Sequence, residues 1–181
     1  MTSLLRTEGP WIGMLFVASA WFTLMPMVQS EVVFDEGFRG RFAPWSDGVE
    51  RPNTYPGYWS SLTQDDVFLS VYPAHARARE IARSGAFPLW DDRVLTGAPL
   101  LANGMVQPLS PYTWIAWLMP LWVGWGMMLF VQAFCCALGV YVFVRDRGGG
   151  PAGAVVAAIA MLYCPVFVWF LPYGSVVGGF A

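Results

Sequence analysis

Apolar residues dominate three stretches of the chain, and a long polar stretch separates the first from the second. The apolar stretches are 11–29, 112–144 and 152–172. A helix needs about 20 apolar residues to cross a bilayer, and a stretch in lipid must be helical because its backbone finds no water there. The pattern therefore predicts an all-α integral membrane protein with about three transmembrane helices.

The charged residues are concentrated in the polar stretch. Of the 22 charged residues, 17 lie between Glu31 and Arg93, and neither 112–144 nor 148–181 contains one. A soluble helical protein of this size would distribute its charges along every amphipathic helix. The net charge is only −2 and there is no long arginine cluster, so nucleic acid is not an expected partner. The partners that we expect are membrane lipid and other transmembrane subunits.

The first apolar stretch has two interpretations. A cleaved signal peptide would have an apolar core of about 7–15 residues followed by a small-residue cleavage site. This stretch is longer, and VQSEVV, the sequence at its end, is a poor cleavage site. We therefore expect residues 1–29 to form an uncleaved transmembrane anchor, which Pro26 ends or kinks.

The second stretch is too long for one untilted crossing. Pro120 and the sequence GWG at 124–126 suggest a division into a Trp-rich interfacial or re-entrant helix at 112–120 and a crossing at about 123–144. The turn at 148–151 leads into a third crossing, whose small residues let another helix approach closely. All three cysteines lie in apolar stretches, where we expect small hydrophobes and no metal site.

Arginines near the ends of the apolar stretches predict the orientation. Arg6 precedes the first stretch, and Arg145 and Arg147 follow the second. Basic residues favour the cytoplasmic side. The N-terminus should therefore be cytoplasmic, and residues 30–111 should form a periplasmic loop of a protein in the bacterial inner membrane.

The second half of this loop shows a helical period. Residues 30–63 are rich in Gly, Pro and aromatic residues, which favours turns. From about 66 to 84, apolar residues recur at steps of three and four, ending before Ser84–Gly85. This spacing predicts an amphipathic helix that lies on a membrane surface. Pro73 either kinks the helix or marks a later start in its first turn.

Two acidic pairs and one histidine are the candidates for chemistry in the loop. Asp65–Asp66 and Asp91–Asp92 could share the work of a general base or bind a divalent cation. Alternatively, one pair caps a helix and the other closes a turn. His75 is the only histidine, so a histidine-based zinc site is not expected, and a hydrogen-bonded structural role is.

Five parts of the loop follow one another in a definite order. They are Asp65–Asp66, Tyr72–Pro73, an arginine-bearing helix over 77–83, GAFPLW at 85–90 and GAPLLAN at 97–103. In this order and spacing the loop resembles the first outer loop of YfhO-like bacterial membrane glycosyltransferases. The resemblance implies a GT-C type fold that takes a sugar from a polyprenyl-phosphate carrier and transfers it to an acceptor outside the cytoplasm.

The resemblance also implies roles for individual residues. Asp65 or Asp66 would be the catalytic base that activates the acceptor hydroxyl. The residues implied in substrate binding are Arg77, Arg79 and Arg83 at the lipid phosphate, and Asn103 and Gln107 at sugar hydroxyls. A divalent cation is the only cofactor that these residues suggest, and no metal ligand is assigned.

The length of the chain affects the functional expectation. Members of the family have many more crossings, so the 181 residues match only their N-terminal part. We expect a truncated relative of such a glycosyltransferase that is not active at this length. The alternative is an accessory or structural transmembrane subunit of a larger respiratory or photosynthetic complex, bound to partner helices. A channel or transporter is less favoured, because no Asp, Glu, His, Lys or Arg lies within 112–144 or 152–172.

Overall fold

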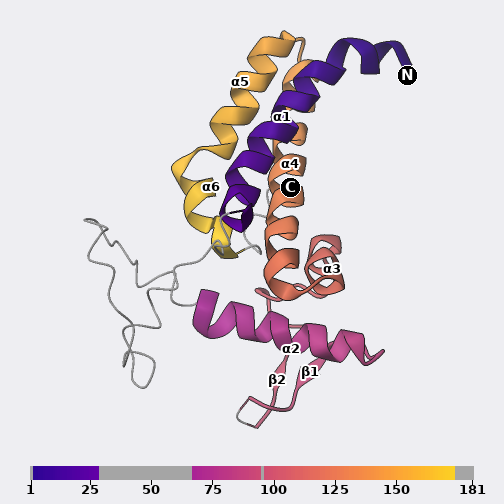
Figure 1. Cartoon of the computed structure of the whole chain (residues 1–181), viewed down its shortest axis with the longest axis vertical. Coiled ribbons are helices and arrows are strands. Elements are labelled where there is room, and N and C mark those ends of the chain that lie inside the picture. Colours follow the sequence, from indigo (N-terminus) through magenta and orange to yellow (C-terminus); the bar gives the residue numbers. More distant parts are fainter. Residues whose placement is uncertain (1, 29–66, 95, 174–181) are drawn as a thin grey trace, which may run out of the picture.

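The computed structural model describes residues 2–28, 67–94 and 96–173, and these are mostly helical (Figure 1). The elements in chain order are α1 (Thr2–Val28), the π-helical turn η2 (Val67–Val71), α2 (Tyr72–Arg83), β1 (Trp90–Asp91), β2 (Ala98–Pro99), α3 (Pro111–Leu118), α4 (Leu121–Asp146), α5 (Pro151–Leu162), α6 (Pro165–Phe170) and the 3-10 turn η3 (Leu171–Tyr173). The all-α fold class is confirmed. The turns expected over 30–63 lie outside the described residues.

Helices α1, α4 and α5 form a three-helix bundle, in which α4 packs against both of the others (Figure 1). Small side chains make this contact close. Ala133 and Ala137 on α4, and Ala154 and Ala158 on α5, are fully buried. The prediction that the small residues of the third stretch allow a close helix approach is therefore confirmed.

A glycine turn joins α4 to α5. Gly148 has φ +82°, a left-handed conformation that favours glycine, and its N–H donates to the carbonyl of Arg145 at 3.0 Å. The N–H of Gly149 donates to the carbonyl of Val144 at 2.9 Å, and Nη1 of Arg145 donates to the carbonyl of Gly149 at 2.6 Å. These bonds satisfy carbonyls at the end of α4 and let α5 return antiparallel to it, as the turn at 148–151 predicts.

The third stretch is not one continuous helix. Helix α5 ends at Leu162, and α6 begins at Pro165 after a break at Tyr163 and Cys164. Proline lacks an N–H, and its ring clashes with the carbonyl four residues earlier, so it kinks or breaks a helix, and at Pro165 the helix breaks. Cys164 caps the new helix by accepting a hydrogen bond from the N–H of Phe167. The 12 residues of α5 span only about 18 Å.

Helix α1 is longer than the first apolar stretch. It begins at Thr2 rather than at about 11, and it ends at Val28, two residues beyond Pro26. Its early turns are tied to α4, because Nη2 of Arg145 donates to Glu8 at 2.6 Å and the hydroxyl of Tyr141 donates to the same carboxylate. The start of α1 and the end of α4 therefore lie at the same end of the bundle.

Helix α2 lies across the opposite end of the bundle, near α3 (Figure 1). Pro73 is in the first turn of α2, after the π-helical turn, which matches the alternative of a later start. The predicted stop is confirmed, because the C-cap is Ser84 and Gly85 has φ +87°. Val67, Val71 and Ala78 of the predicted apolar stripe are buried.

The interior of the bundle is mainly apolar but contains polar side chains, and several large apolar side chains are exposed on its outside. Ser19 and Thr23 on α1 and Gln132 on α4 are buried. Large apolar side chains are exposed on the bundle helices at Met14, Phe16, Val17, Trp21, Val142, Phe143 and Val156. Among the described residues one helix, α4, is long and apolar enough to cross a membrane by length and composition.

Candidate functional site

The two sequence segments GAFPLW and GAPLLAN come together as a small hairpin. Strands β1 and β2 pair antiparallel, with Trp90 opposite Pro99, and the N–H of Leu100 donates to the carbonyl of Leu89 at 2.9 Å. Gly97 has φ +104°, and a Cβ added there would lie 2.3 Å from Nε1 of Trp90. The glycine and the tryptophan of these segments thus have a structural explanation in the packing of the hairpin.

An ion-pair cluster fastens this hairpin to α2. Arg77 contacts Asp91 at 3.2 Å through Nε, Asp92 at 2.6 Å and Glu80 at 3.0 Å, and Arg93 contacts Glu80 at 2.7 Å. Hydrogen bonds from Arg93 and Arg77 lower the pKa of Glu80, and the bond from Arg77 lowers the pKa of Asp92. These carboxylates are therefore charged partners of the two arginines.

The pair Asp91–Asp92 closes a turn, which was one of the two interpretations of its sequence. Oδ1 of Asp91 accepts a hydrogen bond from the N–H of Arg93 at 3.0 Å, the local pattern typical of Asp in turns. Asp91 is buried, whereas Asp92 is exposed. Within the described part of the chain no group of three or more His, Cys, Asp or Glu side chains could hold a metal ion.

The three arginines implied at the lipid phosphate do not converge on one place. The guanidinium of Arg77 is engaged by three carboxylates. Nε of Arg79 donates to the carbonyl of Trp117 at 3.1 Å, which satisfies a carbonyl in the last turn of α3. Arg83 is exposed in the last turn of α2. Their role at a phosphate stays a prediction.

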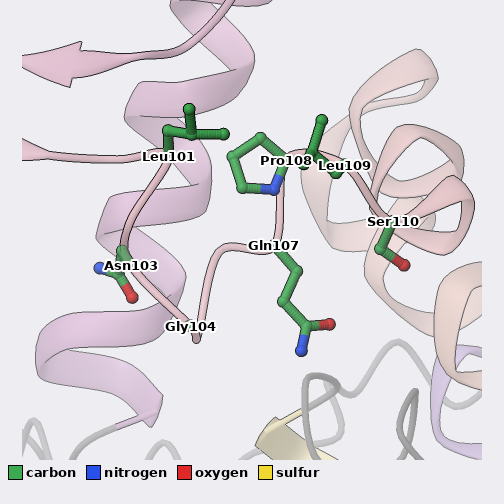
Figure 2. A pocket seen from close by; sticks show the side chains of 7 residues that line it. All are labelled: Leu101, Asn103, Gly104, Gln107, Pro108, Leu109 and Ser110. Atoms are coloured by element: carbon green, nitrogen blue, oxygen red, sulfur yellow. The ribbon is translucent and has the colours of Figure 1, made fainter.

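Asn103 and Gln107, implied at sugar hydroxyls, line one pocket of about 400 Å³ (Figure 2). The pocket is formed by the segment between β2 and α3, with the lining residues Leu101, Asn103, Gly104, Gln107, Pro108, Leu109 and Ser110. None of these side chains carries a charge. The lining combines amide and hydroxyl groups with apolar side chains, and the volume falls within the range of about 300–1,000 Å³ typical of small-molecule sites.

A tight turn shapes this pocket. The carbonyl of Asn103 accepts from the N–H groups of Val106 at 3.1 Å and Gln107 at 3.3 Å, and its Oδ1 accepts from the N–H of Met105 at 2.9 Å. Gln107 has φ +46°, a left-handed conformation that is uncommon for a residue other than glycine. Such a conformation persists only where the surroundings enforce it.

His75 is a buried, hydrogen-bonded structural residue, as its isolation in the sequence predicts. Its Nε2 lies 3.0 Å from the carbonyl of Met105. The ring packs edge-on against Trp125, with the centroids 4.9 Å apart and the planes at 87°. Burial lowers its pKa from 6.5 to about 4, because the charged imidazolium would lose its hydration.

The remaining candidates are two aspartates and three cysteines. Asp65 and Asp66, the candidate catalytic base, lie outside the described residues. Cys135, Cys136 and Cys164 are free thiols.

Sequence reasoning did not find the side chains that hold the pocket from α3. Oγ1 of Thr113 donates to the carbonyl of Val106 at 3.3 Å, and Nε1 of Trp114 donates to the carbonyl of Pro108 at 2.9 Å. The only available signal was their position one turn after the segment 103–110. No protein-family model, curated protein or solved structure matches the chain.

Proposed function

We propose that the chain is a multi-pass protein of the bacterial inner membrane whose outer end binds the sugar of a polyprenyl-phosphate donor, as in the GT-C glycosyltransferases that its loop resembles. The observation that carries this proposal is the uncharged pocket lined by Asn103 and Gln107. Side-chain amides can donate to and accept from hydroxyls, and apolar side chains can cover the face of a sugar ring. A phosphate would need cationic partners, which the pocket lining lacks.

The membrane part of the proposal is supported by the polarity of the bundle. Gln132 and Ser19 are buried in a mainly apolar interior, while large apolar side chains such as Val17 and Val156 are exposed on the outside of the bundle. This arrangement suits lipid, where polar side chains face neighbouring helices. In this proposal α1, α4 and the broken α5–α6 unit cross the membrane, and α2, α3 and the hairpin lie at its periplasmic face.

The catalytic part of the proposal concerns Asp65 and Asp66. One of them would remove the proton from the acceptor hydroxyl as it attacks the sugar carbon bonded to the lipid phosphate, which leaves with that bond's electrons. They immediately precede Val67, the first described residue of η2.

A binding comparison tests the proposal. The full chain in nanodiscs is titrated with a polyprenyl-phosphate hexose and, separately, with the same polyprenyl phosphate without the sugar. We expect tighter binding of the hexose lipid, with a loss of about tenfold in Asn103→Ala and in Gln107→Asn. Asn tolerates the left-handed conformation, so Gln107→Asn shortens the amide without adding strain. Ser84→Ala, exposed at the end of α2, is the control, and equal binding of the two lipids by the parent chain would refute the proposal.

A second candidate function is an accessory subunit of a larger membrane complex. The observation that favours it is an exposed face of α5 made mainly of small residues, Ala152, Gly153, Val156 and Ala160. Such a face allows a partner helix to approach closely in lipid. The native mass of the chain, extracted from its own membranes in a mild detergent, decides the matter: a chain that runs alone at every stage argues against a subunit.

A further inference from the structure

The left-handed turn that presents Gln107 is held from two sides. On the α3 side, Thr113 and Trp114 donate to the carbonyls of Val106 and Pro108. On the α2 side, Nε2 of His75 reaches this turn and lies 3.0 Å from the carbonyl of Met105, thirty positions away in the chain. The carbonyls on both sides of Gln107 are therefore bonded to side chains that belong to other elements.

The hydrogen bond of His75 defines which nitrogen of its ring carries the proton. A carbonyl oxygen only accepts, so Nε2 must carry the hydrogen and Nδ1 must be the unprotonated nitrogen. Nδ1 is buried and finds no partner among the described residues. A buried acceptor without a partner is unfavourable, and an apolar side chain of similar size would avoid this while packing against Trp125 equally well. The feature of histidine that this site uses is therefore the directed N–H at Nε2.

The ring cannot easily turn away from Met105. His75 is 2% exposed, on the side of α2 that faces α3 and α4, and it is held edge-on between Trp125 and Trp117, whose ring centroids lie 4.9 Å and 6.2 Å from its own. A donor fixed in this way holds the backbone at Met105, two residues before Gln107, in a fixed position relative to α2.

We infer that His75 is a positioning residue for the pocket: through the carbonyl of Met105 it fixes the left-handed turn that aims the amide of Gln107 at a neutral, hydroxyl-bearing ligand. His75 acts through the backbone and does not touch the ligand. The identity of the ligand rests on the proposed function, whereas the positioning of the turn does not.

A matched pair of substitutions separates the donor from the ring. His75→Gln places an amide N–H close to the position of Nε2, and His75→Phe keeps an aromatic ring but removes the donor. In the full chain in nanodiscs, we expect His75→Phe to speed amide hydrogen exchange over 103–110 and to weaken binding of a polyprenyl-phosphate hexose by about tenfold. His75→Gln should restore most of both properties, whereas if only the packing of the ring mattered, His75→Gln would be the more damaging change and His75→Phe would be nearly neutral. Ser84→Ala on the same helix is the control.

A measurement on the parent chain does not depend on any variant folding. Because His75 is the only histidine, ¹⁵N-labelled histidine gives one imidazole spectrum. We expect the Nε2–H tautomer and a change of its signals when the hexose lipid is added. The Nδ1–H tautomer, or a Phe variant with parental exchange over 103–110, would overturn the inference. If the parent does not bind the lipid but His75→Phe still loosens 103–110, the proposed function fails and the positioning role stands.

Discussion

Arg145 on α4 donates a hydrogen bond to Glu8 on α1 at 2.6 Å, and this contact brings the start of α1, with Arg6, and the end of α4, with Arg145 and Arg147, to the same end of the bundle. The sequence assigns both arginine-bearing ends to the cytoplasm. The structure has the start of α1 and the end of α4 at one end of the bundle, which is consistent with this prediction. Helix α2 and the pocket lie at the opposite end (Figure 1).

Labelling of one introduced cysteine at a time, beside the three native ones, tests this orientation. We expect Ser84→Cys on the exposed end of α2 to react with a membrane-impermeant maleimide in cells whose inner membrane is intact. Asp146→Cys, exposed at the end of α4, should react only after that membrane is permeabilised. The parent chain measures any reaction of the three native thiols. The opposite pattern would invert the orientation, and equal labelling of both sites in intact cells would contradict a membrane-spanning chain.

Gly124 allows α3 to pack directly on α4. A Cβ at this position would lie 2.3 Å from the carbonyl oxygen of Ala116, and this contact is with backbone, so it cannot be relieved by turning a side chain. We expect Gly124→Ala to destabilise the fold by about 1–3 kcal/mol. Gly139→Ala on the same helix is the control, because a Cβ there meets nothing within 4 Å. That change should be neutral or stabilise by up to about 1 kcal/mol, and thermal unfolding in detergent measures both.

The two carboxylates that follow Trp90, those of Asp91 and Asp92, should differ in how much they stabilise the hairpin. Asp91 is buried and accepts hydrogen bonds from Arg77 and from the N–H of Arg93, whereas Asp92 is an exposed partner of Arg77. We expect Asp91→Asn to speed amide exchange in the hairpin by on the order of tenfold, since a buried donor loses a charged acceptor. Asp92→Asn should leave it nearly unchanged, because exposed ion pairs contribute little. Equal effects would mean that the turn does not depend on the buried carboxylate.

His75 should make the fold sensitive to mild acid. Its pKa is about 4 in the folded chain and 6.5 when unperturbed, so between these values the unfolded chain binds a proton that the folded chain does not. Stability should therefore fall as the pH decreases through this window, by up to about 1.4 kcal/mol per pH unit. The lowered pKa values of Glu80 and Asp92 make their contributions disappear only below about 4.5, their unperturbed range. Melting curves from pH 7 to pH 5 should thus show a slope that is absent in His75→Gln.

The sequence predicted those features that depend on local pattern. The apolar stripe from Val67 to Ile81, the stop at Gly85 and the turn at Gly148 are set by residues close in the chain, and the structure has all three. The α5–α6 break at Pro165 is harder to predict, because whether a helix bends or ends at a proline depends on what caps the freed groups.

Long-range contacts could not be predicted in this way. Nothing near Glu8 indicates Arg145, and nothing near His75 indicates Met105, since each contact depends on how whole helices pack. The arginines of α2 show the same limit. The resemblance implied that they contact a lipid phosphate, whereas in the structure Arg77 pairs with carboxylates of the hairpin, and Arg79 donates to a carbonyl of α3.

The assignment of a catalytic base to Asp65 or Asp66 leads to the last prediction. Replacing a carboxylate by the isosteric amide removes the proton acceptor while keeping size and shape, so Asp65→Asn or Asp66→Asn should reduce sugar transfer by about 10²–10⁴-fold if that residue is the base. Binding of the polyprenyl-phosphate hexose should persist in both variants, because Asn103 and Gln107 are unchanged. Because the sequence led us to expect no activity at this length, the parent chain is first assayed for transfer of a radiolabelled hexose to periplasmic acceptors in membranes, and the variants are compared with it where transfer occurs. Hydrogen exchange checks that the segment around His75 keeps its fold in each variant. Parental rates in both variants would show that neither carboxylate is the base, whereas a loss in one of them would identify which of the two takes the proton.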